Sequence, residues 1–210
     1  MTLIDETDTS TFPRTPRNTV RRLPARAAYD RNSVAAILDE GLVAHIGFAG
    51  DRGQPFVLPT AYARLGDKVI VHGSVISRMM KVLSTGVPMC LTVTLIDGLV
   101  LARSAFHHSM NYRSVTVFGE AVLVTDPGEK AAALKGLTDK LTNGGRWDDL
   151  RPVTSKEVAA TTVLALPLAE AVAKSRSGPP KDDAEDMNWP VWAGVVPLSL
   201  VKGEPITDQA

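Results

Sequence analysis

The sequence has very little cysteine and few aromatic residues. Cys90 is the only cysteine in 210 residues, so no disulfide can form within the chain, and a disulfide-stabilised secreted protein is excluded. Aromatic residues make up 5% of the chain and apolar residues 44%, which predicts a core built mainly from aliphatic side chains. Because Cys90 lies in the apolar run VPMCLTVTLI, we expect its thiol to be buried and inert.

The chain also lacks an excess of charge of either sign. Lys and Arg together number 23, as do Asp and Glu, so no general attraction to nucleic acid or to a membrane surface is expected. No apolar run approaches the roughly 20 residues that span a bilayer, and the N-terminus lacks the apolar core of a signal peptide. These absences predict a soluble, cytoplasmic protein in which a few placed groups would bind any anion.

Several common catalytic and metal-binding motifs are absent. There is no G-x-G-x-x-G, Walker A, G-x-S-x-G or H-E-x-x-H sequence, and no Cys/His cluster with zinc spacing. Neighbouring residues of a strand point to opposite faces, so His107 and His108 would not easily share one ion. We therefore predict no metal site, and we expect His45, inside an apolar strand, to lie in the core.

The first 28 residues differ in composition from the rest. They are rich in Thr, Arg and Pro, and they show no hydrophobic periodicity. We predict a flexible basic arm over residues 1–28, which could drape over a partner or close over a ligand, and one domain over residues 29–205.

From Asp30 onward, short strand patterns alternate with short helix patterns. Helices are predicted at 30–41, 77–86, 126–145 and 154–160, with Asp30, Ser77, Asp126 and Thr154 as N-caps. Strands are predicted at 42–49, 56–65, 68–74, 88–96, 99–106, 112–125, 161–174 and 190–200. The dipeptide Asp97–Gly98 predicts a hairpin turn, and Gly119 a bulge or a close approach. Because the strands come mostly as neighbouring hairpins, we predict a mainly β fold, an antiparallel barrel with peripheral helices.

Polar residues interrupt this apolar pattern at three places. Thr60 in VLPTAY (57–62) offers a hydroxyl to a ligand or faces solvent. HGSVISR (72–78) places two serines and Arg78 at the start of a helix, a set that suits a phosphate, although serine caps are common. SAFHHSMNYRSVTVFG (104–119) could cap a strand or form a dimer contact.

Four segments resemble, in their order, the pyridoxamine 5′-phosphate oxidase-like, FMN-binding split-barrel superfamily. The segments are EGLVAHIGF, PFVLPTAYARLGDKVIVHGSVISRMM, VPMCLTVTLIDGLVLARSAFHHSMNYRSVTVFGEAVLV and WPVWAGVVPLSL, within residues 20–205. The branch they resemble is that of the flavin-nucleotide-binding proteins, which include 5-nitroimidazole resistance proteins. H-G-S-x-x-S-R and N-Y-R-S-V-x-x-F-G are the specific blocks.

The resemblance implies a six-stranded antiparallel split barrel, a homodimer, and two FMN molecules at the subunit interface. The phosphate would be held by Ser74, Ser77 and Arg78, and the isoalloxazine would lie along Val57, Leu58 and Thr60. His72 would lie next to the flavin as a candidate catalytic residue. The partner subunit would contribute one of the adjacent histidines, for which we take His107 over His108, together with Tyr112, Arg113 and Ser114.

Two departures argue against pyridoxamine 5′-phosphate oxidation itself. Met79 stands where those oxidases have a lysine, and EPITDQA (204–210) replaces their Arg-Leu-His-Asp-Arg segment. The resemblance therefore implies an FMN-dependent oxidoreductase for a small nitro- or heteroaromatic substrate, with NADH or NADPH as donor and an imidazole moving the proton. The alternative is a non-catalytic module that binds flavin, deazaflavin or haem for storage or sensing.

Overall fold

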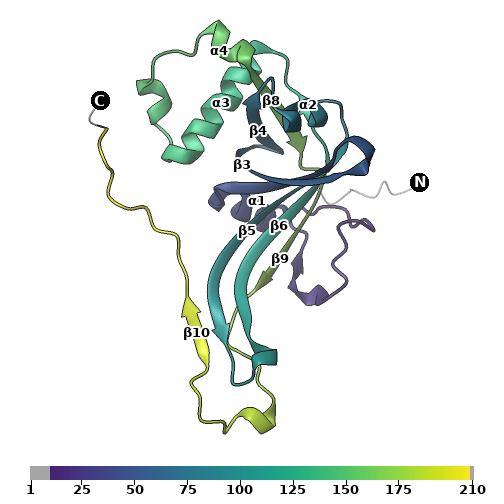
Figure 1. The fold of residues 1–210 in the computed structure, drawn as a ribbon, viewed down its shortest axis with the longest axis vertical. Helices are drawn as coiled ribbons and strands as arrows, with labels where there is room; N and C mark the ends of the chain where they lie inside the picture. The colour runs from purple at the N-terminus through teal and green to yellow at the C-terminus, as the bar shows by residue number, and fades with distance from the viewer. Residues whose placement is uncertain (1–9, 209–210) are drawn as a thin grey trace, which may run out of the picture. The chain divides into compact units, whose positions relative to one another are not determined.

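The computed structural model describes residues 10–208, and its strands form one ten-stranded, mainly antiparallel sheet (Figure 1). Neighbouring strands follow the order β1-β9-β6-β5-β2-β3-β4-β8-β7, and β10 pairs with β5. The strands are β1 (Ala27–Ala28), β2 (Val43–Ala49), β3 (Pro55–Leu65), β4 (Lys68–Ser74), β5 (Pro88–Leu101), β6 (Ser109–Glu120), β7 (Val122–Leu123), β8 (Thr161–Pro167), β9 (Glu170–Arg176) and β10 (Gly194–Pro197). The predicted mainly β class is confirmed, whereas the sheet has ten strands and not the six that the resemblance implies.

The chain divides into two compact units. The first comprises the residues up to Thr94 together with Ser114–Lys174, and the second comprises Leu95–Arg113 together with the residues from Ser175 onward. Strands β5, β6 and β9 each begin in one unit and end in the other. The predicted single domain of residues 29–205 therefore contains two separately packed parts.

The α-helices begin where the sequence places an N-cap. They are α1 (Arg31–Glu40), α2 (Arg78–Leu83), α3 (Pro127–Thr142) and α4 (Ser155–Ala160). Asp30 and Asp126 each accept a hydrogen bond of 2.8 Å from a backbone N–H in the first turn, and Thr154 forms a capping box with Glu157. Ser77 also stands at the N-cap position, but its side chain makes no capping bond.

The core of the first unit is aliphatic, as the composition predicts. In β2 the side chains alternate, so that Ala44, Ile46 and Phe48 are buried. Helix α3 packs beside β3 and β4 (Figure 1). This contact forms a second apolar cluster with residues from three strands: Ala63, Ile70, Ala133, Leu137, Val163 and Ala165.

Tyr62 on β3 connects the sheet to two helices. Its hydroxyl donates a hydrogen bond of 2.7 Å to the carbonyl oxygen of Leu38 near the end of α1. The ammonium of Lys140 on α3 lies 3.9 Å from the centre of the Tyr62 ring and donates to the same carbonyl. Burial raises the pKa of Tyr62 and lowers the pKa of Lys140 to about 8. These contacts hold the middle of β3 in place.

The predicted turn at Asp97–Gly98 is wrong, because β5 runs straight through it. Neither residue has the positive φ that a tight hairpin turn of this kind needs. Gly98 instead faces β10, where a Cβ atom would lie 3.0 Å from Val195 Cγ1 and from the Val196 carbonyl oxygen. The glycine is required for the close approach of a strand that is distant in sequence.

Other boundaries and two burial predictions also differ. The single strand predicted at 161–174 is two strands, β8 and β9, and the strand predicted at 190–200 is confined to β10. His45 is exposed rather than buried, because it alternates with the buried Ala44 and Ile46, and Cys90 is only partly buried. Gly119 is a close approach, since a Cβ there would lie 3.0 Å from Leu166 Cδ1.

Part of the predicted flexible arm packs on the first unit. Residues 1–9 lie outside the described residues. Beyond them, Phe12 is buried, and its backbone N–H donates to the Tyr29 carbonyl oxygen at 2.8 Å. Arg17 forms an ion pair with Glu170 of β9. The structure of residues 10–28 thus differs from the expectation, because a buried aromatic ring and an ion pair offset the low hydrophobicity of the stretch.

We expect Gly41→Ala to destabilise the protein by about 1–3 kcal/mol, as overpacking of a filled core does. A Cβ at Gly41 would lie 2.3 Å from Val93 Cγ1 and 2.9 Å from the Tyr62 hydroxyl oxygen. Urea denaturation measures the change, with Gly203→Ala as the control, because nothing lies within 4 Å of that position. Equal midpoints for the two variants would contradict the expectation.

Candidate functional site

The candidate site lies where β3 and β4 stop pairing. These strands are joined only over Tyr62–Leu65 and Lys68–Val71. Before Tyr62, β3 pairs only with β2, and after Val71, β4 pairs only with β8. The two facing edges therefore have backbone N–H and C=O groups that are not used in a ladder, and such groups seek a partner. We call this place the β3/β4 split, with Pro55–Ala61 on one side and His72–Ser74 on the other.

Hydroxyl groups and one cation lie at the end of the β4 side. Ser74 is the last residue of β4, and Ser77 precedes α2 with its hydroxyl not engaged in capping. Arg78 is exposed, and within residues 10–208 no carboxylate pairs with it. Its guanidinium lies 5.6 Å from the centre of the Phe56 ring on β3, so the two sides of the split come together here. This set of groups suits a phosphate.

Exposed apolar side chains surround the split. Val57 is 67% exposed and Ile76 is 78% exposed, and Leu58 is also exposed. Thr60 is partly buried, and its hydroxyl donates a hydrogen bond of 3.3 Å to the Ala61 carbonyl oxygen. An apolar surface next to hydroxyl groups and a cation suits a ligand that consists of a flat, apolar ring and a phosphate tail.

His72 on β4 is the titratable group of the split. Its side chain reaches the surface, yet partial burial lowers its pKa below the ordinary value of 6.5. The ring is therefore neutral at neutral pH. The neighbouring Gly73 leaves room for α2, because a Cβ there would lie 3.0 Å from Met80.

The remaining predicted residues make contacts elsewhere in the chain. Arg113 forms a two-pronged ion pair with Asp97, with nitrogen–oxygen distances of 2.7 and 3.0 Å. Ser114 donates to the Lys174 carbonyl oxygen at 3.1 Å, and Tyr112 is partly buried on β6. The predicted residues of β3, β4 and α2 thus all lie in the first unit, whereas His107, Tyr112 and Arg113 lie in the second unit.

His107 is bound to an acidic loop that the sequence reasoning treated only as a polar connection. Its Nε2 lies 3.0 Å from Asp183 Oδ2, which raises the pKa of the imidazole, with smaller contributions from Asp182 and Asp186. Arg103 pairs with the almost fully buried Asp182 at 2.8 Å. The acidic residues of KDDAED (181–186) could have indicated a partner for a basic side chain. They could not show which one, because Arg103 and His107 are far away in sequence. Phe56, which packs under Arg78, was missed as well.

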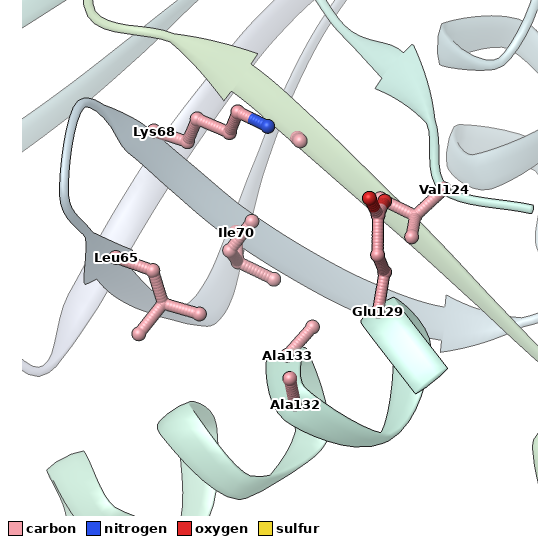
Figure 2. Close-up of a pocket in the computed structure, with 8 residues that line it drawn as sticks. Leu65, Lys68, Ile70, Val124, Glu129, Ala132 and Ala133 are labelled. Atoms are coloured by element: carbon pink, nitrogen blue, oxygen red, sulfur yellow. The ribbon is translucent and has the colours of Figure 1, made fainter. Parts of the chain in front are cut away.

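One hollow of the first unit lies apart from these residues. It has a volume of about 280 Å³ between α3 and the strands β4 and β8, and Lys68 and Glu129 are the charged residues of its wall (Figure 2). The rest of its lining is apolar, and none of the predicted site residues borders it.

Two searches of residues 10–208 found nothing. No three His, Cys, Asp or Glu side chains come close enough to hold a metal ion. Nor does any helix in that range have the length and hydropathy needed to cross a bilayer.

The model of one protein family, described as pyridoxamine 5′-phosphate oxidase, matches residues 30–175. The chain belongs to the pyridoxamine 5′-phosphate oxidase-like family. A comparison with curated proteins found no match for this chain.

Solved structures agree with the family assignment. The flavocytochrome Anf3 from Azotobacter vinelandii is 45% identical with a TM-score of 0.87, and the match covers 93% of this chain and 90% of that one. An FAD- and haem-binding protein from Mycobacterium smegmatis is 36% identical with a TM-score of 0.83, and the match covers 88% and 89%. A candidate 5-nitroimidazole resistance protein from Bacteroides thetaiotaomicron, at 20% identity, a TM-score of 0.60 and coverage of 70% and 85%, shows the fold alone.

The two perturbed histidines should titrate on opposite sides of 6.5, that of His72 below and that of His107 above. Asp183→Asn should lower the pKa of His107, because it removes the carboxylate that stabilises the charged ring, and should leave His72 unchanged. Proton NMR of the imidazole resonances against pH measures both values. A His107 pKa that is the same in the variant would contradict the contact.

Proposed function

We propose that this protein binds a flavin nucleotide at the β3/β4 split and works as a flavin-dependent oxidoreductase. The observation that carries the proposal is the exposed Arg78, which has no carboxylate partner in the described part of the chain and lies beside the uncommitted hydroxyl of Ser77. In a chain of zero net charge, an unpaired guanidinium beside exposed apolar residues is a specific anchor for a phosphate with an apolar ring.

The contacts divide between the two chemical parts of the ligand. Ser74, Ser77 and Arg78 would hold the phosphate, while Val57 and Leu58 would cover the ring. The free backbone edge of β3 around Thr60 would bond to the polar edge of the ring. FMN and FAD share these two parts. The sequence resemblance favours FMN, whereas the Mycobacterium relative is named for FAD.

A second copy of this chain would complete the site. The family resemblance places the segment that contains His107, Tyr112, Arg113 and Ser114 against the flavin of the other subunit. The exposed apolar surface of Val57 and Ile76 supports such a contact, because a homodimer would bury it together with the ring.

The protein would supply orientation and proton transfer. A bound flavin supplies two-electron redox chemistry. His72, neutral at neutral pH, would take up a proton from solvent at a ring nitrogen and pass it to the substrate, because reduction of a nitro group by hydride consumes protons. We expect NADH or NADPH as donor and a small nitro- or heteroaromatic compound as acceptor. We expect no oxidation of pyridoxamine 5′-phosphate, because Met79 and the C-terminal segment depart from the oxidase pattern.

Haem binding is a second proposed function. A protein that binds haem or flavin without turnover would be the non-catalytic module named above. The names of the two relatives at 45% and 36% identity include a flavocytochrome and a haem-binding protein. The chain has an exposed imidazole at His108, and imidazole is a common axial ligand of haem iron.

The purified protein should carry a flavin absorption band, and mass analysis of the released ligand should identify FMN or FAD. Arg78→Ala should weaken binding of the identified flavin by about 10- to 150-fold, the loss of one charge-assisted contact of roughly 1.5–3 kcal/mol. Lys81→Ala, which removes another exposed cation of α2, is the matched control. A protein that takes up neither flavin, or equal affinities in the two variants, would refute the site.

His72→Gln should keep flavin binding but lower the turnover number by about a hundredfold, as loss of a general acid does. In the unchanged protein, turnover should rise as the pH drops below 6.5, because protonation of His72 supplies the acid, and the variant should lose this dependence. Steady-state kinetics with NADPH and a nitroimidazole measure both effects. If the flavin is bound but is never reduced by NADH or NADPH, the non-catalytic module is the correct function.

A further inference from the structure

The four histidines differ in how their ring nitrogens are engaged. Nε2 of His107 is bound to Asp183. Nδ1 of His108 lies 2.9 Å from the carbonyl oxygen of Ser104, which leaves Nε2 directed away from this bond. His45 and His72 have no side-chain hydrogen bond among the described residues.

The arrangement at His108 is the one that prepares an imidazole for a metal. A backbone carbonyl can only accept, so Nδ1 must carry the proton and the lone pair must lie on Nε2. Imidazole ligands usually donate their other N–H to a carbonyl or carboxylate, which sets the ring orientation. His107 presents the opposite case, because its Nε2 is already engaged.

The orienting carbonyl is itself held in place. The backbone N–H of Arg103, the residue before Ser104, donates to Asp182 Oδ1 at 2.8 Å, and the Arg103 guanidinium reaches Asp182 Oδ2 at 2.8 Å. The Asp182 side chain is only 1% exposed. The Ser104 carbonyl oxygen also accepts the backbone N–H of His107, which closes the short helix Ala105–His107. The Ser104 carbonyl that orients the ring of His108 thus directly follows a residue that is fixed by a partly buried ion pair.

Two exposed apolar residues flank His108 in the sequence, and the ring of one of them, Phe106, contacts His107 edge-on with 5.1 Å between the ring centres. Phe106 is 89% exposed, and Met110, two residues after His108 in an extended segment, is 48% exposed. Asn111, the residue after Met110, is buried, so its side of β6 faces inward. A porphyrin is a large apolar plate that needs both an axial nitrogen and apolar contacts.

We propose that His108 would bind the iron of a haem through Nε2, with the exposed Phe106 and Met110 offering apolar contacts to the porphyrin. The assignment rests on the haem-binding function proposed above. Asp182 and Arg103 would act as positioning residues, because they fix the residue that precedes the Ser104 carbonyl.

The test is a titration of the full-length protein with hemin, followed by the Soret band and by electron paramagnetic resonance of the iron. The unchanged protein should bind hemin saturably with a shifted Soret band. His108→Ala should weaken hemin binding by roughly tenfold or more, because even the loss of a residue that only hydrogen-bonds to a metal ligand has about that effect. His108→Gly with added imidazole should restore the spectrum. His45→Ala is the control, because His45 is also exposed but has no orienting bond among the described residues.

Flavin uptake and the far-ultraviolet circular dichroism of each variant report whether it has folded. If the unchanged protein binds no hemin, the haem-binding function fails and this assignment with it. If it binds hemin and His108→Ala keeps the same affinity and spectrum, only the assignment to His108 is overturned. The same holds if His72→Ala or His107→Ala removes the Soret shift while His108→Ala keeps it.

Discussion

The anchoring of Tyr62 is the constraint on which the proposed site depends. Tyr62 is the first residue of β3 that pairs with β4, and its side chain is held by the Leu38 carbonyl and by Lys140. Contacts from two helices thus fix the sheet at one end of the β3/β4 ladder. On the other side of Tyr62 the two strands no longer pair with each other, and a ligand bound there would satisfy their free backbone edges.

Local charge pairing separates Arg78 from six other arginines. Arg17, Arg31, Arg64, Arg103, Arg113 and Arg151 each pair with a carboxylate. An exposed ion pair contributes little to stability, but it neutralises a cation that would otherwise attract anions. These six cations are therefore less available to an anion than Arg78. The ion pair of Arg103 holds the residue that precedes Ser104, whose carbonyl oxygen lies 2.9 Å from Nδ1 of His108.

Short-range signals in the sequence predicted the parts of the fold that short-range forces decide. Asp30, Asp126 and Thr154 cap helices because their side-chain oxygens reach N–H groups three residues away. The strands at 42–49, 56–65 and 68–74 were found by apolar runs and turn residues. The prediction failed at Asp97–Gly98, where β10 pairs with a glycine that reads locally as a turn, and at His45, where the phase of alternation was misjudged.

The sequence by itself determined the mainly β class and the helix starts. It also determined the grouping of Ser74, Ser77 and Arg78, because these residues lie within five positions of one another. Only the tertiary structure decided which groups near them remain uncommitted. The pairing of Arg113 with Asp97, the contact of Phe56 with Arg78, and the attachment of His107 to Asp183 join residues between 16 and 76 positions apart. No local pattern encodes such contacts, because they arise when the ladder and the packing of the whole sheet bring distant segments together.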